Sequence, residues 1–349
     1  MRTVITEGRA KVEEFLSPKI SKELPVFYNP AMALNRDISV LLLRALGKKR
    51  MRVADILAGS GVRGIRLLRE LGKGAIESMA INDGSKDAAR LIKKNLILNG
   101  LGGNKKITVM NKDANLVLLE SSGFDYIDID PFGSPVPFLD AACRRISGGG
   151  ILAVTATDTA PLCGTYPKTC RRRYWAAPKK CGMMHELGLR ILIRRVQLIG
   201  AQYEKSLVPV FCYAREHYFR AFFACGRGNA AVDEMMERHG MLDGVGPLWL
   251  GPLWEPALAK KMDALARKEV KAGKEMIRLL DLIREEADVP AAGFHDIHEL
   301  GRGRGRNIPS REQLISAIRK AGYRASGTHF KGEGIRTTMP QEKLLALMQ

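Results

Sequence analysis

The stretch MRVADILAGSGVRGIRLLREL, residues 51 to 71, contains an apolar run, a glycine-rich turn and an amphipathic segment in that order. The run over 51–57 has the length and composition of a buried β-strand. The segment GIRLLREL repeats its apolar residues at the spacing of one helix face. A strand that passes through a glycine turn directly into a helix is typical of α/β proteins, so this stretch predicts an α/β fold.

Strand-like and helix-like segments continue to alternate through the first half of the chain. Further strands are expected, with helix-like segments between them, at 75–83, 106–113, 124–130 and 150–158. Strict alternation implies right-handed crossovers and a parallel, doubly wound sheet of the Rossmann type. Two later strand-like runs, at 205–214 and 216–225, fit an antiparallel edge that closes this sheet.

Acidic residues stand at or close to the carboxyl ends of the expected strands. Ligands of doubly wound sheets bind at these ends, near the point where the strand order reverses. The candidate binding and catalytic carboxylates are therefore Asp55, Asp83, Asp113, Asp130 and Asp158.

The turn after the first expected strand carries Gly59, Gly61 and Gly64 in the pattern Gly-x-Gly-x-x-Gly. Glycines let a backbone approach an adenosine-type ligand closely, and this pattern serves a dinucleotide or S-adenosylmethionine equally well. Asp83 lies at the end of the next strand, 19 residues after Gly64, where a carboxylate can accept both hydroxyl hydrogens of a ribose. The alternative is that Asp83 caps the helix that follows it.

Asp113 and Ala114 follow the next strand, where a carboxylate can accept a hydrogen bond from an adenine amino group. Here too the alternative is a helix cap. A dehydrogenase built on the same glycine turn would need a nicotinamide site and a proton-transfer residue in the second half of the chain. His185 and His217 are available there, but neither lies in a recognisable motif.

The stretch DYIDIDPFGSP, residues 125 to 135, ends a core-like strand in an acid, a rigid turn and an aromatic ring. Methyl transfer to an aromatic amine is difficult because the nitrogen lone pair is delocalised into the ring. Asp130 at the strand tip can accept a hydrogen bond from such an amine, orient the lone pair and help to remove the proton. Pro131 stiffens the turn, and Phe132 offers a face for a planar base. This combination favours methyl transfer to a nucleobase amine; the alternative is a capping Asp, with Phe132 in the core.

The net charge of +19 is concentrated in two segments. Residues 165–195 hold nine Lys and Arg against one acid, and residues 301–336 hold nine against two. The clusters RRRYWAAPKK, with Tyr174 and Trp175 interleaved, and GRGRGRNIPSR are what a polyanion with exposed bases requires. A merely flexible loop is the alternative for 301–306. The expected contacts to the phosphates of such a polyanion are Arg171, Arg172, Arg302 and Arg304.

Length and composition indicate a globular protein of two domains, because single cores rarely grow past roughly 250 to 300 residues. No apolar run approaches the roughly 18 residues that span a bilayer, and the start MRTVITEGRAKVEEF is too charged for a secretion signal, so we expect a cytoplasmic protein. The six cysteines include no Cys-x-x-Cys pair, and His185-Glu186 lacks the second histidine of a metalloprotease helix. We therefore expect reduced thiols and no metal site.

The segment GVGPLWLGPLWEP, residues 244–256, is dense in Gly, Pro and Trp and interrupts the pattern. Beyond it, a long helical stretch is expected over 257–286, shorter helices around FHDIHEL and SREQLISAIRKAG, and a hairpin from YRASGTHF and GIRTTMP. We predict one domain over 1–255 and a smaller, mainly helical domain over 256–349, with a winged-helix arrangement as one interpretation.

These residues together resemble the tRNA (guanine-26-N2)-dimethyltransferases in their archaeal form, and the resemblance runs through nearly the whole chain. Its most specific blocks are FYNPAMALNRD and the Asp-Pro-Phe-Gly turn with its flanks. Further matching blocks are DILAGSGVRGIR, TATDTAPLCGTYPKTC, GPLWLGPL and GYRASGTHF. Some members carry paired cysteines before the GPLWLGPL block, where this chain has Cys225 alone, so no zinc is expected.

The resemblance implies a Rossmann-like class I methyltransferase fold, S-adenosylmethionine as cofactor, and transfer of methyl groups to the exocyclic N2 of guanosine 26 in tRNA. It also implies a role for Arg36, which its sequence context alone would assign to a surface salt bridge. Asp130 is the implied catalytic residue, and Phe27 and Phe132 would flank the extruded guanine. The expected cofactor contacts are Arg36, Arg63, Asp83, Asp113 and Ala114, together with Gly59 and Gly61 of the turn.

Three alternatives to this function stay open at the level of sequence. The first is methylation of another RNA or nucleobase amine, because Asp130 and Pro131 also suit the amino groups of adenine or cytosine. The second is a nicotinamide-dependent dehydrogenase built on the same glycine turn. The third is a non-catalytic RNA-binding protein that keeps a methyltransferase fold.

Overall fold

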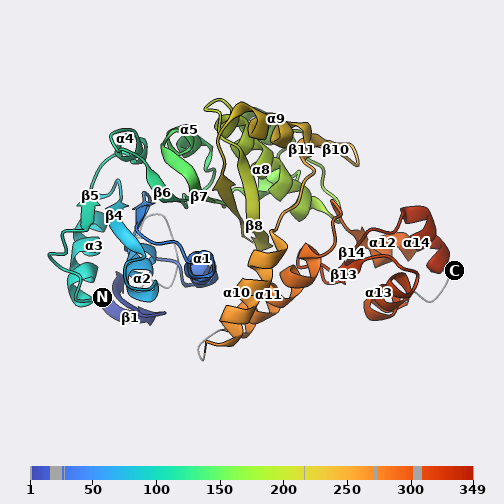
Figure 1. Ribbon diagram of the computed structural model, residues 1–349, viewed down its shortest axis with the longest axis horizontal. Helices are drawn as coiled ribbons and strands as arrows, with labels where there is room; N and C mark the ends of the chain where they lie inside the picture. The colour runs from blue at the N-terminus through green and yellow to red at the C-terminus, as the bar shows by residue number, and fades with distance from the viewer. Residues whose placement is uncertain are drawn as a thin grey trace. The chain divides into compact units, whose positions relative to one another are not determined.

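The computed structural model describes residues 2–15, 26, 28–215, 217–269, 273–301 and 309–348 (Figure 1). The chain forms two compact units. The first unit comprises Met1–Thr155, Ile199–Val208 and Phe222–Val232, and the second comprises Ala156–Leu198, Pro209–Ala221 and Asp233–Gln349. None of the described helices is long and apolar enough to cross a membrane.

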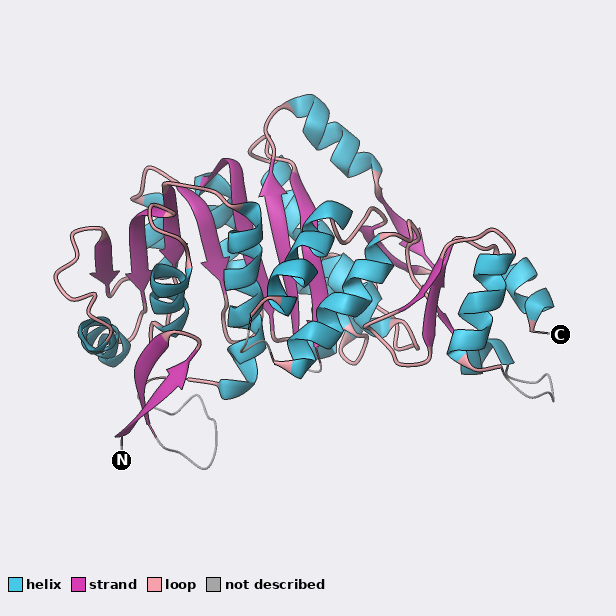
Figure 2. Cartoon of the chain, turned by 60° about the horizontal axis from the view of Figure 1, so that its bottom comes forward, coloured by secondary structure: helices cyan, strands magenta, loops and turns pink. Residues whose placement is uncertain are grey.

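The central sheet has seven strands in the order β5-β4-β3-β6-β7-β9-β8. Figure 2 draws the strands as magenta arrows. β3 pairs in parallel with both β4 and β6, and the pairs β4–β5 and β6–β7 are also parallel. The chain runs outward from β3 to β5 and then crosses to β6, so the switch point lies between β3 and β6. This confirms the predicted doubly wound α/β sheet. The strands are β3 Met51–Asp55, β4 Ile76–Asn82, β5 Ile107–Met110, β6 Phe124–Ile129, β7 Ile146–Ala156, β8 Leu207–Arg215 and β9 Tyr218–Cys225.

The middle strands carry buried apolar residues on both faces of the sheet. Leu152 and Ala153 are adjacent in β7 and therefore point to opposite faces of the sheet, yet both are fully buried. Val53 in β3 and Ile127 in β6 are buried as completely. Each large aliphatic side chain buried in this way stabilises the fold by about 1.5–3 kcal/mol.

Local capping interactions fix the helices that follow the strands of the first unit. The Ser85 side chain accepts a hydrogen bond from the Ala88 N–H at the start of α3. At the carboxyl end of α5, the Lys205 ammonium donates to the backbone carbonyls of Cys143, Arg144 and Ile146. These hydrogen bonds satisfy carbonyls that the end of a helix leaves unpaired. The helices are α1 Ala33–Leu46, α2 Val62–Glu70, α3 Lys86–Leu98, α4 Ala114–Leu119 and α5 Val136–Arg145, and the strands β1 Arg2–Glu7 and β2 Ala10–Phe15 form an antiparallel hairpin.

The second unit departs from the sequence predictions in two places. The long helical stretch expected over 257–286 is divided into two helices, since α10 ends at Arg267 and α11 begins at Lys274. The helix expected at FHDIHEL is a two-residue strand followed by a short helix, and the strand pairs with the expected hairpin to make a three-stranded sheet. The winged-helix arrangement and the domain boundary at 255 stay predictions. The elements after β7 are α6 Thr159–Leu162, α7 Pro167–Tyr174, α8 Met184–Ala201, α9 Asn229–Glu237, β10 His239–Leu242, β11 Val245–Trp249, α10 Pro256–Arg267, α11 Lys274–Ala287, β12 His295–Asp296, α12 Ile297–Gly301, α13 Arg311–Lys320, β13 Ala325–Gly327, β14 Gly334–Thr337 and α14 Gln341–Leu347.

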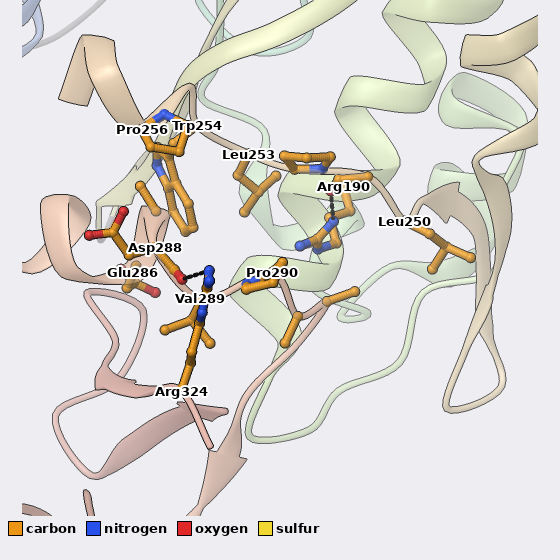
Figure 3. Close-up of a pocket in the computed structure, with 15 residues that line it drawn as sticks. Arg190, Leu250, Leu253, Trp254, Pro256, Glu286, Asp288, Val289, Pro290 and Arg324 are labelled. Atoms are coloured by element: carbon orange, nitrogen blue, oxygen red, sulfur yellow. Dashed lines mark hydrogen bonds between the residues drawn. The ribbon is translucent and has the colours of Figure 1, made fainter. Parts of the chain in front are cut away.

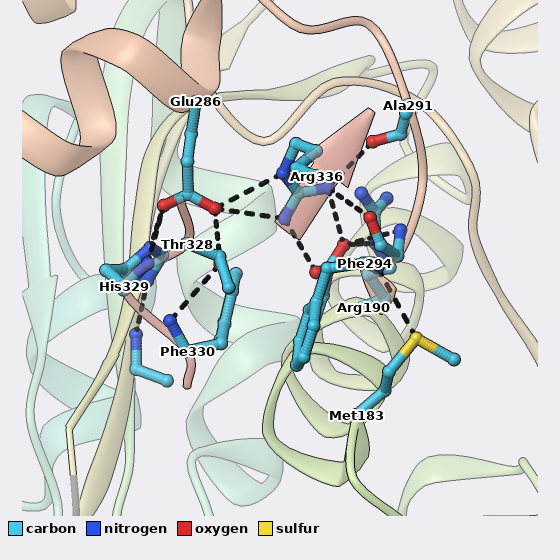
Figure 4. Close-up of polar contacts among 12 residues, drawn as sticks. Met183, Arg190, Glu286, Ala291, Phe294, Thr328, His329, Phe330 and Arg336 are labelled. Carbon is cyan, nitrogen blue, oxygen red and sulfur yellow. Dashed lines mark hydrogen bonds and ion pairs between the residues drawn. The ribbon is translucent and has the colours of Figure 1, made fainter. Parts of the chain in front are cut away.

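A buried ion network, formed by Glu186, Arg190, Glu286, His329 and Arg336, joins three parts of the second unit (Figure 4). The Arg336 guanidinium on β14 donates to Glu186 on α8 at 2.6 Å and to Glu286 on α11 at 3.2 Å. Burial alone would raise the pKa of Glu186, but the two arginines hold it at about 2. Removing one partner from such a pair leaves an unpaired buried charge, so the network fixes α8, α11 and β14 together.

Candidate active site at the strand tips

A cluster of four charged side chains lies where β3 and β6 end, and we call Asp55, Asp128, Asp130 and Arg63 the strand-tip cluster. Asp55 and Asp128 are register partners on the two parallel strands, and Asp130 follows β6 directly. Arg63, in the first turn of α2, forms an ion pair with Asp130 Oδ2 and lies 3.4 Å from Asp128 Oδ2. One guanidinium therefore faces several carboxylates in a buried environment.

Asp55 of the strand-tip cluster has a strongly raised pKa. Burial and the negative charges of Asp128 and Asp130 raise its pKa to about 7, against the opposing effect of Arg63. Its Oδ2 atom is buried without a hydrogen-bond partner in the part of the chain that the structure describes. Strong perturbation beside a specific charge partner is typical of functional sites.

Asp130, the predicted catalytic residue, keeps part of its carboxylate accessible. Its side chain is 17% exposed, and Arg63 binds its Oδ2 atom. Pro131 is buried, whereas Phe132 is 49% exposed, so the interpretation that places Phe132 in the core is wrong. Gly133 then takes a φ of +86°, which turns the chain away from the strand. Acid, turn and exposed ring thus lie together as the sequence predicted.

The glycine turn and Asp83 are held together by backbone hydrogen bonds. The Gly59 N–H donates to Asp83 Oδ2 at 2.8 Å, and the Ser85 N–H donates to Oδ1 at 2.9 Å. Ser85, not Asp83, caps α3. Gly61, with a φ of +78°, is the N-cap of α2. The structure thus brings Gly59 and Asp83 side by side at the tips of β3 and β4.

The close packing of α2 explains the third glycine of the motif. A Cβ atom on Gly64 would lie 2.9 Å from the side chains of Ile81 and Met79 on β4. A larger residue would therefore push α2 away from the sheet and displace the turn that precedes it.

Asp113 follows the end of β5 and is the N-cap of α4. Its Oδ1 accepts from the N–H groups of Asn115 and Leu116 at 2.9 and 3.2 Å, as the alternative interpretation expected. Ala114 beside it is buried. The Asn111 side chain donates to the Asp83 carbonyl at 2.8 Å, so the ends of β4 and β5 are linked.

Arg36 forms a buried ion pair, whereas its sequence context suggested an ion pair at the surface. Its Nε and Nη2 atoms donate to both Glu7 oxygens, at 2.7 and 2.5 Å. Glu7 also accepts from the Tyr28 hydroxyl at 2.8 Å and from Arg66 at 2.9 Å. Burial would raise the pKa of Glu7, but Arg36 and Arg66 hold it at about 2. Sequence reasoning missed Glu7, because its strand carries no motif.

The remaining predicted residues divide into two groups. Phe27, Arg302 and Arg304 lie outside the described residues. Arg171 and Arg172 are exposed on α7 of the second unit. Within the described ranges, no group of three or more His, Cys, Asp or Glu side chains is arranged to hold a metal ion.

A pocket of about 340 Å³ in the second unit is lined by none of these residues (Figure 3). Its wall is largely apolar, with Leu253 and Trp254 among the lining side chains. Arg324 donates to the Asp288 carbonyl at 3.1 Å, and Arg190 donates to backbone carbonyls beside the pocket. The pocket therefore lacks the glycine turn and strand-tip carboxylates of an adenosine site.

The switch point, the glycine turn bound to Asp83 and the accessible acid after β6 define a methyltransferase of the S-adenosylmethionine-dependent α/β class. The sequence model of the family described as N2,N2-dimethylguanosine tRNA methyltransferase matches residues 6–245 and 239–349. The chain belongs to this family.

Individual relatives agree with this assignment over almost their whole length. The tRNA (guanine(26)-N(2))-dimethyltransferase of Pyrococcus abyssi is 38% identical, over 97% of this chain and 96% of that protein. The tRNA (guanine(26)-N(2)/guanine(27)-N(2))-dimethyltransferase of Aquifex aeolicus is 36% identical, over 99% and 95%. Trm1 of Pyrococcus horikoshii, solved with S-adenosyl-L-methionine, superposes with a TM-score of 0.90 at 37% identity and covers 99% of this chain and 100% of its own. The predicted family, fold class, enzyme class and cofactor are confirmed.

Proposed function

We propose that this enzyme transfers methyl groups from S-adenosylmethionine to the exocyclic N2 of guanosine 26 in tRNA, giving N2,N2-dimethylguanosine. Family membership and the names of the relatives support the reaction. The observation that carries the residue assignment is the position of Asp130. It follows β6 directly, with Oδ2 held by Arg63, Oδ1 unbound within the described chain, and the exposed Phe132 two residues on.

Asp130 overcomes the weak nucleophilicity of the guanine amine. S-adenosylmethionine supplies a methyl group on a positively charged sulfur. As the N–C bond forms and the S–C bond breaks, one amine proton must leave, and Asp130 Oδ1 accepts it. Arg63 fixes the orientation of the carboxylate through its hydrogen bond to Oδ2. The proton then passes to solvent. S-adenosylhomocysteine must leave and a second S-adenosylmethionine must bind before the second methyl transfer can follow the same steps.

The strand tips supply the proposed cofactor contacts. Asp83 faces the ribose beside the backbone of Gly59 and Gly61, and Asp113 and Ala114 face the adenine. Arg36 has Nη1 without a partner among the described residues, and we assign this nitrogen to the carboxylate of the cofactor's methionine part. Arg63 would contact the methionine part of the cofactor while it also holds Asp130.

The guanine must leave its stack before its amine reaches the methyl group, because the target lies inside a folded RNA. Phe27 and Phe132 would flank the extruded base, with Pro131 stiffening the turn. Phosphates would be bound by Arg171, Arg172, Arg302 and Arg304, for affinity and register more than for base identity. We assign cofactor binding to a domain over 1–255 and further tRNA contacts to 256–349, and we place the enzyme in the cytoplasm.

Nucleoside analysis tests the reaction. The enzyme is incubated with labelled S-adenosylmethionine and tRNA transcripts that carry guanosine or inosine at position 26. Inosine lacks the N2 amine, so we expect dimethylguanosine from the first transcript and no label at position 26 of the second. Equal label in both transcripts, or N6-methyladenosine as the product, would contradict the proposal.

A further inference from the structure

Trp175 ends helix α7 in an unusual backbone conformation. Its φ of 55° and ψ of 40° lie in the left-handed region, where helix ends usually carry glycine because other side chains are strained. The side chain is nevertheless large and 51% exposed, whereas Trp249 and Trp254 are 1% and 5% exposed. A strained position occupied by an exposed aromatic ring indicates that the ring itself is needed.

Arg195 supports the Trp175 ring from one face. Its guanidinium carbon lies 3.5 Å from the ring centroid. Its Nε and Nη1 atoms are buried and have no hydrogen-bond partner among the described residues. Burying such donors is costly, and the cation–π contact offsets that cost. Because one face of the indole is covered and half of the side chain is exposed, the opposite face is open to a planar ligand.

The backbone on both sides of Trp175 is anchored. Tyr174, predicted from the sequence to be a second stacking group, is instead fully buried, and its hydroxyl donates to Asp158 at 2.6 Å. On the other side, Ala177 exchanges two backbone hydrogen bonds with Gly246, at 2.7 and 3.0 Å. The ring is therefore held in place before any ligand arrives, which lowers the entropic cost of binding.

The cations within seven residues of Trp175 in the chain are largely without ion-pair partners among the described residues. Arg173 pairs with Asp158 at 3.1 Å, but Lys168, Arg171 and Lys179 are exposed and form no ion pair with a described residue. A cationic surface attracts a polyanion, and an open aromatic face selects one with accessible flat rings. RNA with unpaired bases meets both requirements, whereas the bases of a duplex are hidden in the stack.

We propose that Trp175, supported by Arg195, is a stacking site for an unpaired nucleobase of RNA, and that Lys168 and Arg171 contact the neighbouring phosphates. The proposal rests on the proposed function in taking tRNA as the RNA. It adds a base contact outside the strand-tip cluster. Stacking of one base on an aromatic side chain corresponds to a change of roughly 5- to 150-fold in affinity, and it tolerates any base.

Tryptophan fluorescence reports on this site directly, because Trp175 is the exposed one of the three tryptophans. Titration of the wild-type enzyme with the guanosine-26 transcript should quench the emission and protect it from iodide. Trp175→Phe keeps a stacking ring, so it should bind within a few-fold of wild type but show no quenching. Quenching that persists in Trp175→Phe would overturn the proposal.

Affinity measurements with Trp175→Gly provide the second test. Glycine suits the observed φ, and this gain offsets the lost contact with Arg195, so the variant should fold with a stability close to that of wild type. Its tRNA affinity should fall roughly 5- to 150-fold with an unchanged salt slope, because no phosphate contact is lost. Met241→Ala, at another exposed apolar residue of the second unit, should bind like wild type.

The two proposals fail in different ways. Trp175→Gly that binds tRNA as tightly as wild type, in an enzyme that still methylates guanosine 26, would refute the stacking site and leave the function intact. A wild-type enzyme that methylates no tRNA would refute the function, while the fluorescence titration would still decide whether Trp175 stacks on RNA.

Discussion

The strand-tip cluster and the buried ion network hold buried charges in opposite ways. In the strand-tip cluster three carboxylates face Arg63, and the pKa of Asp55 is raised to about 7. In the buried ion network two glutamates are matched by two arginines, which together hold the pKa of Glu186 at about 2. The candidate active site thus has more carboxylates than cations, whereas the buried ion network, which holds elements of the second unit together, has as many arginines as glutamates.

Breaking the balance of the buried ion network should have a large effect on stability. Arg336→Met leaves Glu186 and Glu286 with too little positive charge in a buried site, so we expect the free energy of unfolding to fall by about 3–5 kcal/mol. Denaturant unfolding followed by circular dichroism measures the change. Lys343→Met, at an exposed lysine of α14, is the control and should stay within about 0.5 kcal/mol. Equal losses in the two variants would show that the network does not stabilise the second unit.

The contributions of the strand-tip cluster and of the buried ion network to the free energy of unfolding should change with pH in opposite directions. The folded-state pKa of Asp55, about 7, lies above its unfolded value, so Asp55 costs stability as the pH rises toward 7. The folded-state pKa of Glu186 lies below its unfolded value, so its contribution is present at neutral pH and is lost as the pH falls toward 2.

Asp55→Asn removes the first of these effects. We compare the free energy of unfolding of the variant with that of wild type at two pH values. The difference in favour of the variant should grow by about 1–3 kcal/mol from about pH 5 to pH 8. Denaturant titrations at the two pH values measure this difference, with Glu77→Gln at an exposed strand residue as the control. A difference that does not change with pH would mean that Asp55 is already ionised at low pH.

The smallest effect is expected on the surface of α7. Replacement of Arg171 and Arg172 by alanine should weaken tRNA binding several-fold and reduce the slope of log affinity against log salt by about 2. Filter binding over roughly 50–200 mM salt measures the slope. The exposed pair Lys93 and Lys94 on α3 provides a matched control. An unchanged slope in the Arg171 and Arg172 variant would remove these residues from the RNA surface.

The strand tips could be predicted because their signals are local in sequence. Asp83, Asp113 and Asp130 each lie within three residues of a strand end, so the alternation of strands and helices was enough to place them on one edge. The break between α10 and α11 also had a local signal, because Gly273 precedes α11, but the helical pattern on both sides outweighed it.

Contacts between distant segments could not be predicted from sequence. Glu186 and Arg336 are 150 positions apart, and neither lies in a motif that names the other. The pairing of Arg36 with Glu7 likewise depends on how the β1–β2 hairpin packs in the first unit. Which of Tyr174 and Trp175 is exposed depends on where α7 ends and which way its last turn faces. The presence of two neighbouring aromatic residues in the sequence does not show this.

The most direct test of the catalytic assignment is the single-turnover rate of methyl transfer by Asp130→Asn at saturating tRNA and S-adenosylmethionine. Asparagine keeps the size of the side chain but cannot take the amine proton, so we expect a loss of roughly 10²–10⁴-fold with tRNA affinity within a few-fold of wild type. Asp125→Asn, on the same strand and at its opposite end, should retain activity. Methyl transfer by Asp130→Asn at near wild-type rate would contradict the role of Asp130 as the proton acceptor.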